Sequence, residues 1–559
     1  MATVCNMETD IKAEVIDFGY LYEKRKIELH STLGENLNEM CKYLLELEPD
    51  VVSFYSLCSS YHINIMLSKR IKELNKNVFV LFGGPQASLT AEKTLKAFSW
   101  VDYIGMDEGE ETIVTILRAI VDRLDKMPSG IAYRNPENEY EIIITESKEC
   151  DIDRMEYIDY SLVDMDGVTS IPIDVGRGCP FGCIYCSTKT FWKRKFRLKS
   201  ISRIISELER LKEKYQINNF SFVHDLFTVN KLSVIEFCEN VIGRKLNITW
   251  SCSARLDTLS EPLLDYMYEA GCRRIFLGIE TGSPKMQKLI NKNLNLDLVK
   301  DLKYYFQKYN IDFTCSFIYG FPQETEEDLR KTLNVIREVW ENGAATIQLH
   351  KATILPGTAL FQEYKEKLRY NPLCTDFTDP IYIDNEAVGY IKNYKDIFPQ
   401  FYSIQTVATT YKYLDIFIYY FYTVLSQFLP NTYCHLIQAA DNDLLNLYKS
   451  FENFIGDIFE EISEKGMNYI EKIYQEDVIL KFLNLYFERY FQNEISMEYE
   501  MMKFEMDAFN FMKSKEKIQI KIYQYDILKM LSKSEVKNRS RITVKFERLD
   551  KDKINVMYI

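Results

Sequence analysis

The sequence has few glycines and prolines, no long apolar run and no excess of positive charge, and each shortage excludes a class of protein. With 21 Gly and 14 Pro in 559 residues and an apolar fraction of 47%, the chain is neither collagen-like nor of low complexity. Its 82 Asp and Glu exceed its 69 Lys and Arg, for a net charge of −13, which disfavours a sequence-independent nucleic-acid binder. The most apolar C-terminal run, residues 416–425, is about ten residues long, whereas a membrane helix needs roughly twenty, so we predict no membrane span.

Signals of secretion are also missing. We recognise no apolar leader, and the 13 cysteines are scattered along the chain rather than grouped as in small disulfide-rich domains. We therefore expect a cytoplasmic protein with mostly reduced thiols, a few of which could bind a metal. A chain of this length exceeds what one core usually organises, so about two to four domains are expected.

Short β-rich runs alternate with helix-length segments near the N-terminus. Near-continuous apolar strands separated by helices predict a buried parallel sheet with helical crossovers. We expect an incomplete doubly wound α/β domain over residues 1–135, followed by a hairpin and a connecting segment over 136–170. The predicted strands are 15–18, 51–55, 78–82 and 102–105, and the clearest helix between them is 64–75.

A second alternating series occupies residues 171–360. Six βα units in roughly 190 residues are too many for a small sheet and too few for a closed eightfold barrel. We therefore expect an open, partial (β/α)6 barrel with its chemistry at the carboxyl ends of the strands. The predicted strands are 171–175, 220–224, 248–252, 274–279, 313–318 and 346–350.

Residues 361–559 predict a mainly helical domain that ends in short strands. Helices are indicated over 443–466, with Asp443 as N-cap and Gly466 at the end, and over 470–491. Their Tyr and Phe residues suit either an ordinary core or an aromatic wall around a substrate channel. Strands are predicted at 518–523, 542–546 and 554–559.

The strongest chemical signal is a group of three cysteines directly after a predicted strand. Cys179, Cys183 and Cys186 are separated by three and then two residues, a spacing that lets thiolates surround one metal centre. Structural zinc would need a fourth Cys or His nearby, yet the first one after Cys186 is His224. A [4Fe–4S] cluster held by three cysteines leaves one iron open for a small-molecule ligand. Structural zinc and ordinary buried thiols are the alternatives.

On these residues the sequence resembles the radical SAM superfamily, whose signature is CxxxCxxC with an aromatic residue, here Tyr185, before the last cysteine. Five later segments resemble the strand motifs of that family in order: 222–227, 250–255, 278–283, 319–325 and 355–358. The resemblance implies a [4Fe–4S] cluster that reductively cleaves S-adenosylmethionine (SAM), and a 5′-deoxyadenosyl radical that abstracts hydrogen from an unactivated carbon. It implies Cys179, Cys183 and Cys186 as cluster ligands. It implies SAM contacts for Tyr185, Asp225, Ser253, Arg255, Glu280, Ser316 and Leu355.

The two acids in this set suit their implied roles chemically, whereas His224, next to Asp225, departs from the family's pattern. Asp225 suits the ammonium of SAM, and Glu280 suits the ribose hydroxyls. His224 stands where the family usually has another acid. It is either an acid or base near the substrate or a hydrogen-bonded structural histidine.

Loops after three strands of the first predicted sheet resemble those of the cobalamin-binding domain that precedes many radical SAM modules. Ligands of doubly wound domains bind at this edge, and the resemblance implies cobalamin contacts for Ser56, Ser59, Ser60, Gly83, Gly84, Glu108 and Glu110. No Asp-x-His-x-x-Gly motif is present, so no cobalt-ligating histidine is indicated. The usual first strand would precede Val15, where only fourteen residues remain, and Gln86 stands where the family often has His. A truncated cobalamin domain and a vestigial scaffold both stay open.

These observations predict an enzyme that tailors a peptide or another natural product. If cobalamin binds, methylation of an unreactive carbon is expected; if not, rearrangement, epimerisation, cross-linking or oxidation. The expected partners are a small-molecule or peptide substrate and an external one-electron reductant of flavodoxin or ferredoxin type. A non-catalytic iron–sulfur or electron-transfer protein is the alternative from another class.

Overall fold

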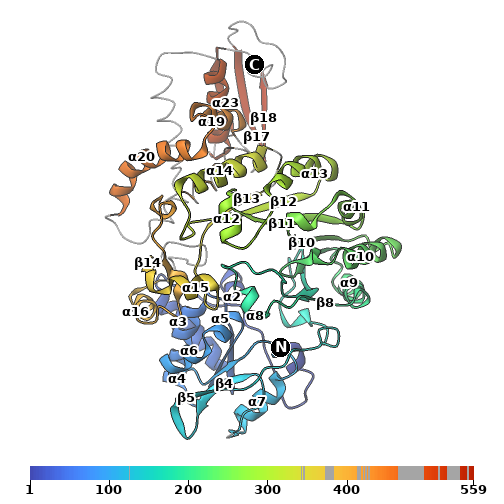
Figure 1. Ribbon diagram of the computed structural model, residues 1–559, viewed down its shortest axis with the longest axis vertical. Helices are drawn as coiled ribbons and strands as arrows, with labels where there is room; N and C mark the ends of the chain where they lie inside the picture. The colour runs from blue at the N-terminus through green and yellow to red at the C-terminus, as the bar shows by residue number, and fades with distance from the viewer. Residues whose placement is uncertain are drawn as a thin grey trace. The chain divides into compact units, whose positions relative to one another are not determined.

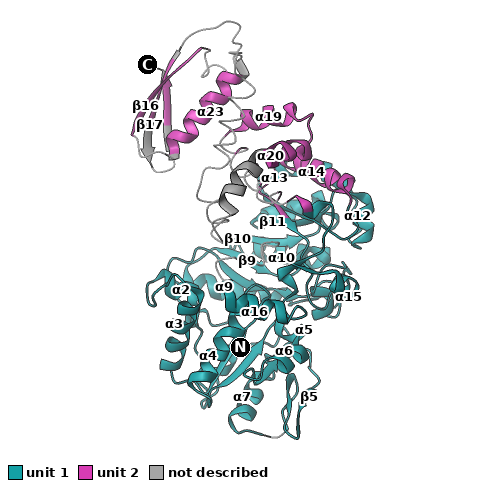
Figure 2. Cartoon of the chain, turned by 90° about the vertical axis from the view of Figure 1, so that its left-hand side faces the viewer, with its two compact units in different colours: residues 1–324, 350–409 teal, residues 325–349, 410–559 magenta. Residues whose placement is uncertain are grey.

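The computed structural model divides into two compact units (Figure 2), whose helices and strands are labelled in Figure 1. The first comprises Met1–Glu324 and His350–Thr409, and the second comprises Thr325–Leu349 and Thr410–Ile559. The residues described are 1–124, 126–341, 343, 346–371, 383–411, 414, 417–418, 421, 425, 429–463, 497–513, 517–524, 542–550 and 553–558.

The first sheet has three parallel strands extended by an antiparallel hairpin. Its order is β1 (Val51–Tyr55), β2 (Phe79–Gly83), β3 (Tyr103–Gly105), β4 (Ile131–Asn135) and β5 (Asn138–Ile144). β1, β2 and β3 run parallel, as predicted, because helices cross over between them. A hairpin is present, but its first strand, β4, precedes the predicted range 136–170, and it belongs to this sheet because β4 pairs antiparallel with β3. The helices are α1 (Ala2–Cys5), α2 (Phe18–Glu23), α3 (Leu33–Glu46), α4 (Tyr61–Leu74), α5 (Pro85–Leu89), α6 (Ala91–Ala97) and α7 (Ile113–Val121).

The prediction of a strand over residues 15–18 is wrong. Residues 11–17 have no regular structure, and α2 begins at Phe18, where the Asp17 side chain accepts a hydrogen bond from the Tyr20 amide at 3.1 Å. A β-branched run becomes a strand only where a neighbour pairs with its backbone. Among the described residues β1 is an edge strand that pairs with β2 alone, so no partner stands beside residues 15–18.

The second sheet carries the predicted six strands in chain order, which leaves it open. From one edge to the other lie β6 (Ile171–Asp174), β9 (Asn219–Val223), β10 (Thr249–Ala254), β11 (Cys272–Glu280), β12 (Asp312–Tyr319) and β13 (Thr346–Lys351). The strands from β6 to β12 all pair in parallel. A short hairpin, β7 (Gly176–Arg177) with β8 (Arg197–Leu198), follows β6. The helices are α8 (Thr188–Phe191), α9 (Ile201–Tyr215), α10 (Lys231–Gly243), α11 (Glu261–Glu269), α12 (Pro284–Leu289), α13 (Asp301–Tyr309) and α15 (Ala359–Tyr364).

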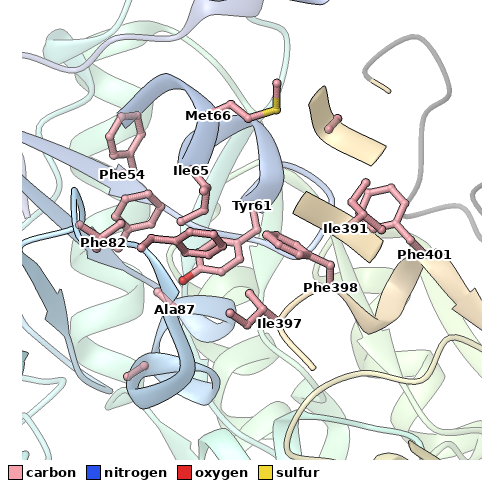
Figure 3. Packing of buried hydrophobic residues seen from close by; sticks show 14 of the residues in the cluster. Phe54, Tyr61, Ile65, Met66, Phe82, Ala87, Ile391, Ile397, Phe398 and Phe401 are labelled. Atoms are coloured by element: carbon pink, nitrogen blue, oxygen red, sulfur yellow. The ribbon is translucent and has the colours of Figure 1, made fainter. Parts of the chain in front are cut away.

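The segment after the second sheet returns to the first sheet and completes its core. Helix α16 (Asn385–Asn393) precedes Phe398, which is fully buried with its ring centroid 6.0 Å from that of Tyr61 on α4 (Figure 3). Two buried glutamines add polar links: Gln86 donates to the Ile397 carbonyl at 2.8 Å and Gln400 to the Cys58 carbonyl at 2.7 Å. A short pair, β14 (Arg369–Tyr370) with β15 (Tyr402–Ser403), lies in the same segment.

The second unit contains helices and a three-stranded antiparallel sheet. The predicted helix over 443–466 is confirmed over its described part, since Asp443 caps α20 by accepting from the Leu445 amide at 2.8 Å. The prediction for 470–491 lies outside the described residues. The three predicted strands are confirmed as β16 (Ile518–Tyr523), β17 (Ile542–Asp550) and β18 (Lys553–Tyr558). The described helices are α14 (Glu326–Glu341), α19 (Pro430–Ala439), α20 (Leu444–Ser463) and α23 (Met497–Lys513). None of the helices in the described ranges is long and apolar enough to cross a membrane.

Removing the Phe398 ring should destabilise the first unit. Phe398→Ala leaves a cavity among Tyr61 and its neighbours and is expected to cost about 3–5 kcal/mol of unfolding free energy. Leu232→Ala, on α10 at a side chain that is 78% exposed, is the matched control and should cost less than about 0.5 kcal/mol. Calorimetry would record the two melting temperatures. Equal midpoints would contradict a shared core.

Candidate functional site

The three cysteines lie on a loop between β7 and β8, residues 178–188, which we call the cysteine loop. Hydrogen bonds from other segments hold its conformation. The Ile184 amide donates to the Ile290 carbonyl at 3.1 Å, and the Ile184 carbonyl accepts from the Leu360 amide at 3.1 Å. The Asn291 side chain donates to the Gly182 carbonyl at 2.9 Å. The loop begins at Gly178, whose φ of +80° favours glycine, and a Cβ there would lie 2.0 Å from the Lys195 carbonyl oxygen.

The three thiols gather in a partly buried environment. Cys183 is buried, and Cys179 and Cys186 are half-buried. Burial, with smaller contributions from the other two thiols, raises the pKa of Cys179. Iron would displace the protons, since only the thiolate is a ligand.

The donor set fits an iron–sulfur cluster. Among the residues that the structure describes, no three His, Cys, Asp or Glu side chains converge closely enough to bind one metal ion. A four-iron cluster holds its thiolates further apart than one zinc ion does. Three thiolates on one loop therefore suit a [4Fe–4S] cluster with one iron open.

Asp225 ties the two ends of the cysteine loop together. Its Oδ2 accepts from the Gly178 amide at 3.0 Å and its Oδ1 from the Thr188 hydroxyl at 3.1 Å. A carboxylate has about four lone-pair sites, so two remain to accept from an ammonium group. The structure thus places Asp225, which is predicted to contact SAM, directly beside the cysteine loop.

The ring of His224, in contrast, is held by backbone groups. Its Nδ1 accepts from the Leu226 amide at 2.8 Å, so the proton resides on Nε2, which lies 3.3 Å from the Arg197 carbonyl oxygen. Burial lowers the pKa of His224, because it disfavours the charged ring. Because both ring nitrogens bind backbone, this geometry favours the structural interpretation over the acid–base one.

Glu280 ends β11 in a backbone conformation unusual for its residue type. Its φ is +72°, next to an irregularity in the pairing of β11 with β12. Its Oε1 lies 2.9 Å from the Lys292 ammonium, and both side chains are buried. Burial and the hydrogen-bonded Glu280 carboxylate hold the pKa of Tyr185 well above its ordinary value. Gly278 leaves room for the Glu280 side chain, since a Cβ at residue 278 would lie 2.3 Å from Glu280 Oε1.

Arg255, directly after β10, presents an unused buried donor. Its Nε and Nη2 contact Asp257 at 2.9 and 2.7 Å, and its guanidinium lies 4.0 Å from the centre of the Phe181 ring on the cysteine loop. Its Nη1 is buried and has no hydrogen-bond partner among the described residues. Leaving a buried donor unsatisfied costs about 1–3 kcal/mol. A carboxylate such as that of SAM would satisfy it.

Small hydroxyl side chains line one face of the second sheet. Ser253 pairs in register with Phe276, and Ser316 pairs with Gly278, so the two predicted SAM residues share the face of Gly278. Three further hydroxyl side chains lie on this face and were not predicted from the sequence. Alternation along each strand was the signal that could have identified them: Ser221, Ser251 and Thr314.

Leu355 is half-buried in a turn that reaches the end of the cysteine loop. The Leu355 carbonyl accepts from the Thr358 hydroxyl at 2.7 Å, and the Gly357 carbonyl accepts from the Thr190 hydroxyl on α8 at 2.5 Å. The Leu355 backbone therefore lies in a turn that is linked to the loop.

Part of the predicted cobalamin set lies at one edge of the first sheet. The Ser56 amide donates to the Gly83 carbonyl at 2.8 Å, which joins the loops after β1 and β2. Gly84 has a φ of +93° and approaches the Ser56 backbone, whereas a Cβ at Gly83 would meet open space. Ser59 is exposed and Ser60 half-buried. These loops fit a ligand that approaches the backbone closely.

The two glutamates of that set are engaged elsewhere. Glu108 accepts from Arg177 at 2.5 Å and from Arg197 at 2.6 Å, and Glu110 accepts from Arg177 at 2.6 Å. Although burial opposes it, the hydrogen bonds from the two arginines hold the pKa of Glu108 below its ordinary value. Both glutamates therefore anchor the β7–β8 hairpin rather than facing a free ligand site.

Comparisons with known proteins agree with this site. Residues 173–336 match the model of the radical SAM superfamily. A methyltransferase of Pyrococcus horikoshii, named as uncharacterized, is 30% identical over 61% of this chain and 75% of its own length. The anaerobic magnesium-protoporphyrin IX monomethyl ester cyclase of Rubrivivax gelatinosus is 27% identical over 58% of this chain, which spans 60% of that relative.

Two solved structures share the fold at low sequence identity. The radical S-adenosylmethionine methyltransferase TsrM from Kitasatospora setae, with tryptophan and a SAM analogue bound, superposes with a TM-score of 0.54 at 16% identity, over 66% of this chain and 74% of that one. The cobalamin-dependent S-adenosylmethionine radical enzyme OxsB, with aqua-cobalamin and SAM bound, gives 0.57 at 14% identity, over 91% of this chain and 80% of that one.

Gly178→Ala should lower iron and sulfide loading severalfold after anaerobic reconstitution. An alanine is strained at this φ, and its Cβ would overlap the Lys195 carbonyl oxygen. Gly243→Ala, where a Cβ meets open space, is the control. Iron, sulfide and cluster absorbance provide the measurement, and full loading of Gly178→Ala would show that the loop does not hold the cluster in this conformation.

Proposed function

Because the chain belongs to the radical SAM superfamily, we propose that it tailors a natural product by a radical reaction at an unactivated carbon, with methylation of that carbon as the outcome. The chain is an enzyme, and its superfamily uses a [4Fe–4S] cluster and SAM, a reductant and a small substrate. The observation that supports SAM chemistry here is the convergence of Asp225, Glu280 and Arg255 on the cysteine loop. An electron carrier has no need for such partners.

The residues of the loop and of the second sheet have distinct tasks in this proposal. Cys179, Cys183 and Cys186 would hold the cluster, which when bound supplies the electron that cleaves SAM to a 5′-deoxyadenosyl radical. Glu280 accepts from the ribose hydroxyls, and Asp225 accepts from the amino group. The unused Nη1 of Arg255 donates to the carboxylate.

Four further residues complete the SAM site of the proposal. Tyr185 holds Glu280 through its hydroxyl, and Leu355 lies in the turn linked to α8. Ser253 and Ser316 lie on the face of the sheet that carries Gly278, where small side chains leave room for a ligand. Binding on a rigid sheet orients the reacting atoms.

Methylation is supported by the names of the relatives and by the loops of the first sheet. Two of the similar proteins are called methyltransferases, and OxsB is called cobalamin-dependent. Cobalamin, when bound, would supply a methyl group for a substrate carbon. Ser56, Ser59, Ser60, Gly83 and Gly84 would hold it, while Glu108 and Glu110 serve the hairpin.

A cobalamin-free reaction is the second candidate, and one observation favours it. Among the described residues β1 is the edge of the first sheet and no strand lies over residues 11–17, so no strand covers the open side of β1 there. Rearrangement, epimerisation, cross-linking or oxidation would then follow hydrogen abstraction.

The proposed partners are a small-molecule or peptide substrate and a flavodoxin- or ferredoxin-type electron donor. A radical SAM enzyme needs a reductant, and in this proposal the electron donor is a separate protein.

Anaerobic turnover with SAM and dithionite tests the radical chemistry. Wild-type protein should form 5′-deoxyadenosine, and Cys183→Ala should form none because the cluster loses a ligand. Glu280→Gln should raise the SAM dissociation constant about 10-fold or more, since a charged hydrogen bond contributes about 1.5–3 kcal/mol. Glu236→Gln, on an exposed part of α10, is the control. Equal 5′-deoxyadenosine from wild type and Cys183→Ala would refute the enzyme function.

Purification from cobalamin-fed cells tests the methylation outcome. Wild-type protein with full cluster loading should carry a corrin absorption band. Gly83→Leu should lose the band without losing stability, because its side chain would fill the open space beside the loop. Gly389→Leu, in α16 and also beside open space, should keep it. A wild-type protein without the band would eliminate cobalamin-dependent methylation in favour of the second candidate.

A further inference from the structure

The turn after α12, residues 290–293, contacts both the cysteine loop and the two side chains that flank it. On one side, the Ile290 carbonyl and the Asn291 side chain hold the loop at Ile184 and Gly182. On the other side, Lys292 reaches Glu280 with its ammonium at 2.9 Å and accepts from Arg255 Nη2 with its carbonyl at 2.9 Å. Four hydrogen bonds from one short segment thus join the loop to Glu280 and Arg255.

The conformation of this turn is itself constrained. Asn291 and Asn293 have φ values of +55° and +53°, a region that asparagine tolerates better than most residues. The buried Gln287 holds the turn, because its carbonyl accepts from the Lys292 amide at 3.1 Å and the Asn293 amide at 3.0 Å. Its side-chain oxygen accepts from the Leu294 amide at 3.1 Å.

Gln287 also fixes the backbone around Glu280. Its side-chain amide donates to the Ile279 carbonyl at 2.8 Å and to the Thr281 carbonyl at 2.7 Å, the residues on either side of Glu280. The left-handed φ of Glu280 is therefore held by the same helix that positions Lys292. Such a conformation persists only where the surroundings over-determine it.

The buried charges of Lys292 and Glu280 stabilise each other. Lys292 and Glu280 are 8% and 7% exposed, and a charge buried to that degree is costly without a partner. Lys292 takes one carboxylate oxygen, Oε1, so the other oxygen of Glu280 has capacity for a ligand hydroxyl.

We propose that Lys292 is a positioning residue for SAM: through its ammonium it orients Glu280, and through the turn 290–293 it holds Glu280 and Arg255 in register with the cysteine loop. The inference rests on the proposed function, because it assumes that Glu280 and Arg255 contact SAM. Lys292 itself contacts no reacting atom. It acts by fixing the residues that do.

The test is SAM binding to anaerobically reconstituted full-length protein, measured as a dissociation constant and as the change in the cluster's EPR spectrum on SAM addition. Lys292→Met should weaken SAM binding about 10- to 100-fold, the usual effect of losing a supporting partner, while iron content stays at the wild-type level. Lys292→Arg, which keeps the charge, should restore most of the affinity. Lys288→Met, four residues earlier and exposed, is the matched control and should bind as wild type.

A double-mutant cycle separates positioning from general loss of structure. If Lys292 acts through Glu280, Lys292→Met should add less than about twofold when made in a Glu280→Gln background. The double variant also removes both buried charges, so it remains informative if Lys292→Met alone folds poorly. The inference, but not the proposed function, would be overturned if Lys292→Met bound SAM with wild-type affinity. It would also be overturned if the effects of the two substitutions on affinity multiplied. A wild-type protein that carries the cluster yet fails to bind SAM would overturn the proposed function and the inference with it.

Discussion

The cysteine loop has no long secondary structure of its own, and the site depends on the hydrogen bonds that other segments make to it. Ile290, Asn291 and Leu360 bind its carbonyl and amide groups, and Asp225 joins its beginning to α8. A loop that is ordered in this way has already lost its conformational entropy, so cofactor binding need not offset that cost. Because the groups that bind the loop lie on or beside rigid strands and helices, they hold the three thiols in one arrangement.

Buried charge pairs organise the surroundings of the loop. Arg177 and Arg197 join the hairpin beside the loop to Glu108, and Lys292 joins the turn after α12 to Glu280. Such pairs add little to stability compared with apolar residues of the same size, but breaking one is costly. In this chain each of them lies where an element must keep one orientation relative to the cysteines.

The first sheet is small, and it relies on a segment from far along the chain. Only three of its strands are parallel, and β1 forms an unpaired edge among the described residues. The residues around Phe398 and Phe401 supply apolar surface against Tyr61, and Gln86 and Gln400 satisfy buried carbonyl groups at the junction. A small core gains stability in proportion to the apolar area that it buries, which explains why this segment packs with the sheet.

The sequence by itself determined the features that short-range patterns encode. Six strands of the second sheet, three strands near the C-terminus and the cap at Asp443 were all predictable, because strand and helix periods and capping residues act over a few residues. The spacing of the three cysteines likewise predicted the loop that we propose as the cluster site. Only the tertiary structure decided that residues 15–18 form no strand, since a strand requires a neighbour.

Tertiary structure also decided which charges the site uses. Glu108 meets Arg177, 69 residues later, and the lysine that orients Glu280 is one of many in the sequence. Both nitrogens of His224 bind backbone groups that no local pattern brings to it. The physical reason is the same in each case: a buried ionic or polar group takes whichever partner the fold places within hydrogen-bond distance, and sequence separation carries no information about that distance.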